Sequence, residues 1–130
     1  MTVLRPGIVV GDWRNGNVMR FNTIYHLMRF FDTVASSLGD GVIRVAARAE
    51  ATKNIIPVDY FARAAWHIIS SGQPGTYHLT APSPIALGEL RSVFGELFGT
   101  SRTRLVDEQD FARCRPTRAE RKCRKVSAPY

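Results

Sequence analysis

The stretch Val3-Leu4-Arg5-Pro6-Gly7-Ile8-Val9-Val10-Gly11-Asp12 is rich in aliphatic and β-branched residues and ends at a turn signal, Gly11-Asp12. A short apolar run without alternation is typical of a central strand in a parallel sheet that is covered on both faces. Pro6 and Gly7 interrupt the run, because proline donates no ladder hydrogen bond and glycine lets another backbone or a ligand approach closely. Two interpretations follow: a ligand bound beside the carboxyl edge of the sheet, or a bulge without a ligand.

Further along the chain, apolar residues at three- and four-residue steps predict helices over residues 22–38, 59–71 and 87–98. The expected N-terminal caps are Asn22 or Thr23 for the first helix and Asp59 for the second. The expected C-terminal glycines are Gly39, Gly72 and Gly99. The aromatic first helix leaves two interpretations open, since its apolar surface could line a substrate cavity or belong to the core.

Strands are predicted over residues 42–45, 76–80 and 102–106, the last as an edge strand. A final helix begins near Pro116, where Thr117 and Glu120 have the spacing of a capping box. Its surface is mostly Arg and Lys. The chain therefore alternates strands and helices, which predicts an α/β fold with a largely parallel sheet.

The charge of the chain is concentrated near its end. The net charge is +7, but residues 1–101 hold nine basic and seven acidic residues, whereas residues 102–130 hold nine and four. Such a segment could contact phosphates of nucleic acid or an anionic surface. A solvated helix face, or a segment that docks on an acidic surface, is the favoured interpretation, because few aromatic residues accompany the charges.

The composition and the cysteine and histidine positions limit the other classes of protein to which the chain could belong. The chain of 130 residues is 45% hydrophobic, which fits one globular domain or part of one. We expect no membrane span and a cytoplasmic location, since no apolar run is long enough and no signal peptide is recognisable. Cys114 and Cys123 lack the spacing of a zinc site and are expected to be reduced thiols. His26, His67 and His78 are scattered, so we expect no metal site.

Three motifs in order carry a resemblance to a family. Arg5-Pro6-Gly7-Ile8-Val9-Val10-Gly11-Asp12, then Pro57-Val58-Asp59-Tyr60, then Tyr77-His78-Leu79-Thr80 resemble the C-terminal half of an extended short-chain dehydrogenase/reductase. The motifs are most similar to the thioester-reductase and fatty-acyl-reductase-like branch, within the NAD-dependent epimerase/dehydratase superfamily. The resemblance implies the distal part of a Rossmann-like, largely parallel sheet with flanking helices, over residues 1–106. A basic helical tail occupies residues 107–130.

The resemblance also implies an activity, which is the reduction of a carbonyl or acyl thioester by hydride transfer from NADP or NAD. The family needs a glycine-rich loop for the cofactor pyrophosphate and a Tyr-x-x-x-Lys pair for proton transfer, and this sequence contains neither. Tyr25, for example, has Arg29 four residues later. We therefore expect that the N-terminal nucleotide-binding half is a required partner, that the chain alone is inactive, and that it carries no catalytic residue.

By the same resemblance, Pro6, Gly7 and Ile8 would lie beside the nicotinamide ring. Asn17, Tyr25, Met28 and Arg29 would help to form the wall of the pocket for an acyl or carbonyl substrate. Asp59 could be a catalytic acid, although a cap at the start of the second helix explains it fully. The alternative function is a small basic binding module that contacts nucleic acid or an anionic surface through residues 113–130.

Overall fold

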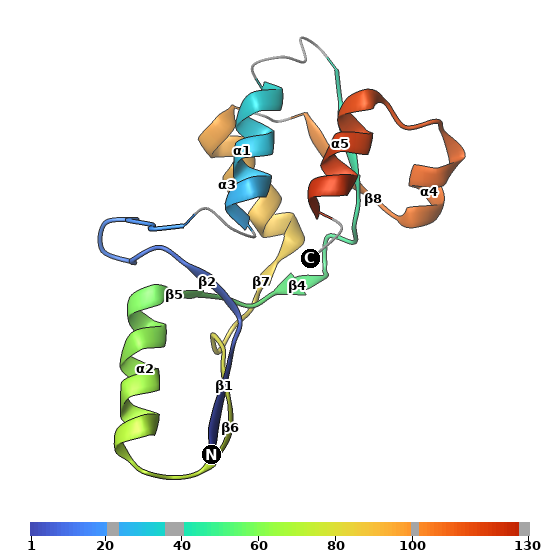
Figure 1. Cartoon of the computed structure of the whole chain (residues 1–130). Helices are drawn as coiled ribbons and strands as arrows, with labels where there is room; N and C mark the ends of the chain where they lie inside the picture. The colour runs from blue at the N-terminus through green and yellow to red at the C-terminus, as the bar shows by residue number, and fades with distance from the viewer. Residues whose placement is uncertain (21–23, 36–40, 100–101, 128–130) are drawn as a thin grey trace. The chain divides into compact units, whose positions relative to one another are not determined.

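The computed structural model describes residues 1–20, 24–35, 41–99 and 102–127, and these residues form an α/β structure (Figure 1). Its elements are β1 (Thr2–Pro6), β2 (Ile8–Val10), α1 (Ile24–Ala35), β3 (Ile43–Ala46), β4 (Thr52–Lys53), β5 (Ile55–Pro57), α2 (Val58–Ser70), β6 (Gly75–Leu79), β7 (Ile85–Ala86), α3 (Leu87–Phe98), β8 (Thr103–Val106), α4 (Glu108–Arg113) and α5 (Arg118–Ser127).

The chain forms two compact units. Unit 1 consists of Met1–Phe21 and Lys53–Ile85, and unit 2 consists of Asn22–Thr52 and Ala86–Tyr130. The short strands β4 and β7 pair with each other and contain the points where the chain passes from one unit to the other. Both units are therefore built from two separate stretches of sequence.

Unit 1 is organised around the apolar stretch at the start of the chain. β1 pairs in parallel with β6, and β2 pairs in parallel with β5. The N–H of Gly7 donates to the carbonyl of Leu79 at 3.0 Å, and the N–H of Ile8 donates to the carbonyl of Asn54 at 2.8 Å. Because successive amides of a strand point to opposite sides, β6 and β5 flank this stretch on opposite sides. The parallel pairing and the interruption at Pro6-Gly7 are confirmed, but the run forms two short strands whose residues are half-buried or exposed, and not one buried strand.

Helix α2 covers unit 1 by packing against β1, β2 and β5. It ends at Ser70, and Gly72 follows with a φ of 67°, as the sequence predicts. The prediction that Asp59 caps this helix is wrong. The N-cap lies two residues earlier, at Pro57, and no side chain caps the helix, so Asp59 lies inside the first turn. A carboxylate there still interacts favourably with the helix dipole.

Unit 2 packs four helices around the parallel pair β3–β8. Helix α5 contacts both β3 and α1, and α1 also contacts α3. The rings of Phe31 in α1 and Phe94 in α3 lie 5.7 Å apart between their centroids. Phe30 and Phe31 are 5% and 6% exposed. Of the two interpretations of the first helix, the structure therefore places these two aromatic residues in the core.

Several predicted helix ends in unit 2 are confirmed. Helix α3 has the predicted bounds, and Gly99 after it adopts a left-handed φ of 63°. The capping box at the start of α5 forms in both directions between Thr117 and Glu120. The short helix α4 was not predicted. The expected caps Asn22, Thr23 and Gly39 lie outside the described residues.

Helices α4 and α5 of the C-terminal segment pack within unit 2. Phe111 in α4 is 3% exposed and Glu120 in α5 is 1% exposed, and both helices pack on β3. The described part of the basic segment therefore belongs to unit 2. Within the described ranges, no helix has the length and apolar character needed to cross a membrane.

Candidate functional site

Pro6, Gly7 and Ile8, which are predicted to lie beside a cofactor, lie at the junction between β1 and β2. A Cβ atom on Gly7 would lie 2.7 Å from the carbonyl oxygen of Asn54 and 2.8 Å from its Oδ1. Real Cβ atoms do not approach other atoms so closely, so only glycine fits here. The predicted close approach of another group to Gly7 is observed, and on this side the group is Asn54, through its backbone and its side chain.

Asn54 connects three segments of unit 1, and the sequence analysis did not single it out. Its carbonyl accepts the N–H of Ile8. Its side chain accepts the N–H of Ala81 at 2.8 Å through Oδ1 and donates to the Ala81 carbonyl at 3.1 Å through Nδ2. Asn54 thus fixes the chain that leaves β6 against the start of β2. An amide directly before an apolar strand is the only sequence signal for this role.

A tight loop follows β2 at the carboxyl edge of the sheet. Asp12 accepts the Arg14 N–H through its side chain at 2.8 Å, and its own N–H donates to the Asn17 carbonyl at 3.0 Å. Asn17, a predicted substrate residue, is exposed at the end of this loop. Carboxyl edges of parallel sheets are where ligands bind in open α/β folds.

Asp59 attaches this loop to α2. Its Oδ1 accepts the N–H of Trp13 at 3.2 Å, and its Oδ2 accepts from Arg63 at 3.3 Å. The Trp13 residue is 67% exposed. The carboxylate of Asp59 therefore holds the loop and leaves the indole open to solvent beside the sheet edge, which is a positioning role.

The other predicted substrate residues lie together on α1, in unit 2. Met28 and Arg29 lie three and four residues after Tyr25, so both lie next to Tyr25 on the same side of the helix. Tyr25 and Met28 are partly buried, and Arg29 is exposed. The structure thus brings these three together, and it places Asn17, Pro6, Gly7 and Ile8 in unit 1.

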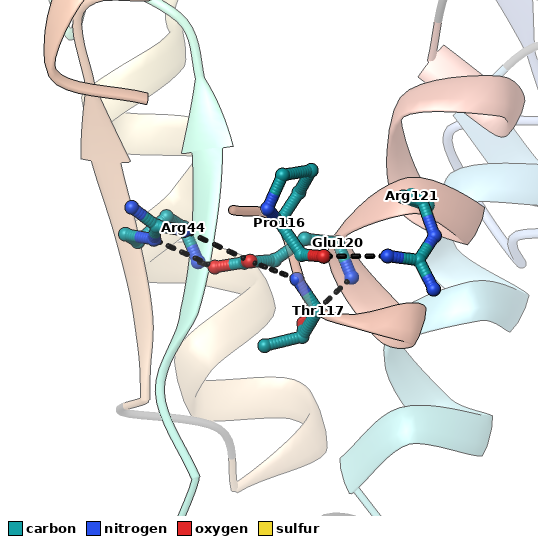
Figure 2. A network of polar contacts seen from close by, with 5 residues as sticks. All are labelled: Arg44, Pro116, Thr117, Glu120 and Arg121. Atoms are coloured by element: carbon teal, nitrogen blue, oxygen red, sulfur yellow. Dashed lines mark hydrogen bonds and ion pairs between the residues drawn. The ribbon is translucent and has the colours of Figure 1, made fainter. Parts of the chain in front are cut away.

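Unit 2 contains a buried carboxylate network that the sequence analysis found only as a helix cap (Figure 2). Arg44 of β3 donates to Glu120 of α5 through Nε at 2.8 Å and NH2 at 3.1 Å. The N–H groups of Arg44 and Thr117 donate to the same carboxylate at 3.0 Å and 2.8 Å. Hydrogen bonds from Arg44 hold the pKa of Glu120 at about 2, and the same bond raises the pKa of Arg44.

A cavity of about 290 Å³ lies beside this network. The ring of Phe111 forms one wall and lies near two guanidinium groups, 5.4 Å from Arg44 and 5.8 Å from Arg124. Arg124 in turn pairs with Glu108 at 2.7 Å. Burial raises the pKa of the Cys123 thiol in this wall to about 11. The carboxylates of Glu108 and Glu120 are paired with arginines, and the thiol of Cys123 stays protonated. These groups therefore contribute to the stability of unit 2 more than to acid–base chemistry.

The described residues contain no group of three or more His, Cys, Asp or Glu side chains that could hold a metal ion. Cys114 and Cys123 are free thiols, as predicted; the first is exposed and the second is buried. By the general rule for parallel sheets, the candidate site is the carboxyl edge of unit 1, where the Asp12–Asn17 loop is held by Asp59.

Comparison with known proteins shows the fold. No protein-family model matches the sequence, and no curated protein matches it. Among solved structures, the UDP-N-acetylglucosamine 4-epimerase from Bacillus cereus matches with a TM-score of 0.52 at 15% identity, over 83% of this chain and 35% of that chain. The same enzyme from Methanobrevibacter ruminantium M1, in complex with UDP-N-acetylmuramic acid, matches with a TM-score of 0.54 at 13% identity, over 97% and 43%. The chain thus spans less than half the length of these proteins and has the fold of part of them.

Proposed function

We propose that this chain is the substrate-side part of an NAD(P)-dependent enzyme of the extended short-chain dehydrogenase/reductase class. Its reaction would be the reduction of a carbonyl or an acyl thioester by hydride transfer. The observation that carries the proposal is the parallel strand interrupted at Gly7, with its loop at the carboxyl edge of the sheet. The structural neighbours support the class, because these 4-epimerases belong to the same superfamily as the resembled family.

The chain does not by itself supply a complete cofactor site. On one side of Gly7 the space is filled by Asn54, so a nicotinamide ring would have to approach from another side. No glycine-rich loop is present for the pyrophosphate. By the family resemblance, Tyr25, Met28 and Arg29 on one side of α1 would contact the substrate, and Asn17 in the loop after β2 is a separate candidate contact, while a nucleotide-binding half holds NADP or NAD.

The test uses the protein isolated from its natural source and the 130-residue chain alone. We expect NADPH or NADH to quench tryptophan fluorescence of the natural protein and to leave that of the isolated chain unchanged. Peptide mapping of the natural protein should then reveal a glycine-rich loop and a Tyr-x-x-x-Lys pair. A natural protein whose peptides all fall within residues 1–130, and which binds neither cofactor, would contradict the proposal.

The substrate class is tested on the same natural protein with a long-chain acyl-CoA thioester, a simple aldehyde and UDP-N-acetylglucosamine. We expect cofactor oxidation with the first two. Conversion of the UDP-sugar without net cofactor oxidation would instead indicate the reaction named for the structural neighbours. Arg29→Gln should change the KM for an anionic substrate, whereas His67→Ala, at an exposed position of α2, is the matched control.

The basic binding module is the second candidate function, and helix α5 is the observation that favours it. Arg118, Lys122 and Lys125 are exposed, and within the described residues they have no acidic partner. A fluorescently labelled 20-base-pair DNA duplex measures it directly. Binding that weakens steeply between 50 and 200 mM salt, and that disappears in the variant Arg118→Gln/Lys122→Gln/Lys125→Gln, would support this function.

A further inference from the structure

Trp13 is an exposed aromatic residue in a loop whose backbone is fixed. The residue is 67% exposed, although tryptophan is largely buried in most folded proteins. Its N–H donates to Oδ1 of Asp59 at 3.2 Å, and the N–H of Arg14 donates to Oδ1 of Asp12 at 2.8 Å. The indole therefore lies in solvent while the backbone that carries it is held in place.

Further contacts close the same loop. The N–H of Gly16 donates to the Asp12 carbonyl at 2.8 Å, and the N–H of Asn17 donates to Oδ1 of Asn15 at 2.8 Å. A Cβ atom on Gly11 would lie 2.8 Å from the carbonyl oxygens of Gly16 and Asn17, so the loop folds back directly against the end of β2. A loop that is already ordered loses little entropy when a ligand binds to it.

Arg14 adds a positive charge directly after the tryptophan. It is exposed, and within the described ranges it has no acidic partner. By sequence, unit 1 has five Lys and Arg residues and two carboxylates, Asp12 and Asp59. Both carboxylates accept N–H groups of the loop. The loop thus combines a flat aromatic surface with a positive charge that no described carboxylate pairs with.

This combination suits a planar base that carries phosphate groups. Bases stack on aromatic side chains, and a guanidinium binds phosphate oxygens through paired N–H donors. An acyl chain alone would contact the indole and leave Arg14 unused, and a simple anion would do the reverse. The position of the loop, at the carboxyl edge of a parallel sheet, is where ligands bind in open α/β folds.

We propose that Trp13 and Arg14 bind the nucleotide portion of the substrate, an inference that rests on the proposed function. For an acyl thioester, this portion is the phosphorylated adenosine of coenzyme A. Trp13 stacks on the base, and Arg14 pairs with a phosphate. Asp59 positions the loop. The two residues thus determine which carrier of the acyl group is preferred, and they take no part in hydride transfer.

Calorimetric titration of the protein from its natural source, and of its variants, with coenzyme A, uridine diphosphate and NADPH tests the assignment. Trp13→Ala and Arg14→Gln should each raise the Kd for coenzyme A about 5- to 100-fold and leave the Kd for NADPH unchanged. Trp13→Phe keeps an aromatic ring and should recover most of the affinity. Trp66→Ala and Arg20→Gln, at exposed positions of unit 1, are the matched controls and should change neither Kd.

Steady-state kinetics gives a second readout on the same proteins. The same acyl group is supplied as its thioester with coenzyme A and with N-acetylcysteamine, which has no nucleotide. Trp13→Ala should lower kcat/KM for the coenzyme A thioester about 5- to 100-fold through KM, and leave that for the shorter thioester unchanged. An equal loss with both thioesters would overturn the proposal, because Trp13 would then act on the acyl group or on the loop itself.

The remaining outcomes separate the site from the proposed function. If coenzyme A binds equally to wild type and to both variants, or does not bind, the proposal is wrong even where the protein reduces thioesters with NADPH. Weaker binding of NADPH or uridine diphosphate, with that of coenzyme A unchanged, would overturn the assignment to the acyl carrier. Binding of coenzyme A that depends on Trp13 and Arg14, in a protein that binds neither NADH nor NADPH, would support the site and contradict the proposed function.

Discussion

At the scale of single residues, the carboxylate of Glu120 is the most constrained polar group in the described structure. It is 1% exposed and accepts from the Arg44 side chain and from two backbone N–H groups. Removing its charge leaves these donors without a strong acceptor. Buried donors left in this way typically cost about 1–3 kcal/mol of stability.

Glu120→Gln should therefore lower the free energy of unfolding by about 1–3 kcal/mol at pH 7. The pKa of Glu120 is about 2 in the folded protein, below its ordinary value of 4.5, so its contribution is complete above pH 4.5 and declines as the pH falls toward 2. Urea denaturation followed by circular dichroism at pH 7, 5, 4 and 3 measures the difference from wild type, which should shrink below pH 4.5. Glu89→Gln, at an exposed position of α3, is the matched control. A difference that is as large at pH 3 as at pH 7 would contradict this account.

The two thiols should differ in reactivity. Cys123 is 2% exposed and burial raises the pKa of its thiol to about 11, so little thiolate forms at pH 8, whereas Cys114 is exposed. We expect the aromatic disulfide reagent DTNB to titrate one thiol per folded chain and two in guanidinium chloride. Cys114→Ser should abolish the reaction of the folded chain, and a rapid reaction in that variant would show that Cys123 is accessible.

At the scale of elements, the stretch 2–10 depends on the absence of a side chain at position 7. Gly7→Ala would place a Cβ within 2.8 Å of two Asn54 oxygens, one of them backbone, so β2 and β5 would have to separate. We expect a loss of about 1–3 kcal/mol in the free energy of unfolding.

Gly88→Ala in α3 is the control for this change. A Cβ at position 88 would meet its nearest atoms at 3.4 Å, an ordinary contact, and alanine favours a helix. Its stability should be unchanged or slightly higher. Thermal denaturation of both variants gives the comparison, and equal melting temperatures would mean that Asn54 moves away at little cost.

The elements were predictable where the sequence carries local signals. The apolar run with Pro6-Gly7, the glycine after α3 and the capping box at Thr117 each act within a few residues, and each is confirmed. Asp59 was misassigned because Pro57, two residues earlier, is the N-cap of α2. The contacts of Asn54 and the pairing of Arg44 with Glu120 join residues 27 and 76 positions apart, respectively. No local pattern encodes such separations.

At the scale of the whole molecule, positive charge is most concentrated on the outer face of α5. Its only acidic residue, Glu120, points inward and pairs with Arg44, so it does not neutralise the outer face. Cys123 is buried on the inner side of the helix. The formal net charge of +7 therefore understates how concentrated the field is near this helix.

The clustering of Lys and Arg on α5 predicts how the protein elutes from a cation exchanger. The variant Arg118→Gln/Lys122→Gln/Lys125→Gln and the control Arg14→Gln/Arg20→Gln/Arg29→Gln lose the same number of charges. We expect the α5 variant to elute from a cation exchanger at clearly lower salt than the control, because clustered charges bind a matrix jointly. Coincident elution would show that the charges act independently of their position.

The pairing of β1 with β6 also has a consequence for biosynthesis. Thr2 finds its partner at Gly75, so 73 further residues must leave the ribosome before the pair can form. At 5–20 residues per second this takes roughly 4–15 s. During that interval β2 gains its partner β5 as soon as residues 55–57 emerge, whereas β1 still lacks β6, and a stretch of unit 2 is synthesised in between. β1 thus waits longer for its partner strand than β2 does, and a chaperone that binds residues 2–6 would shield them until β6 emerges.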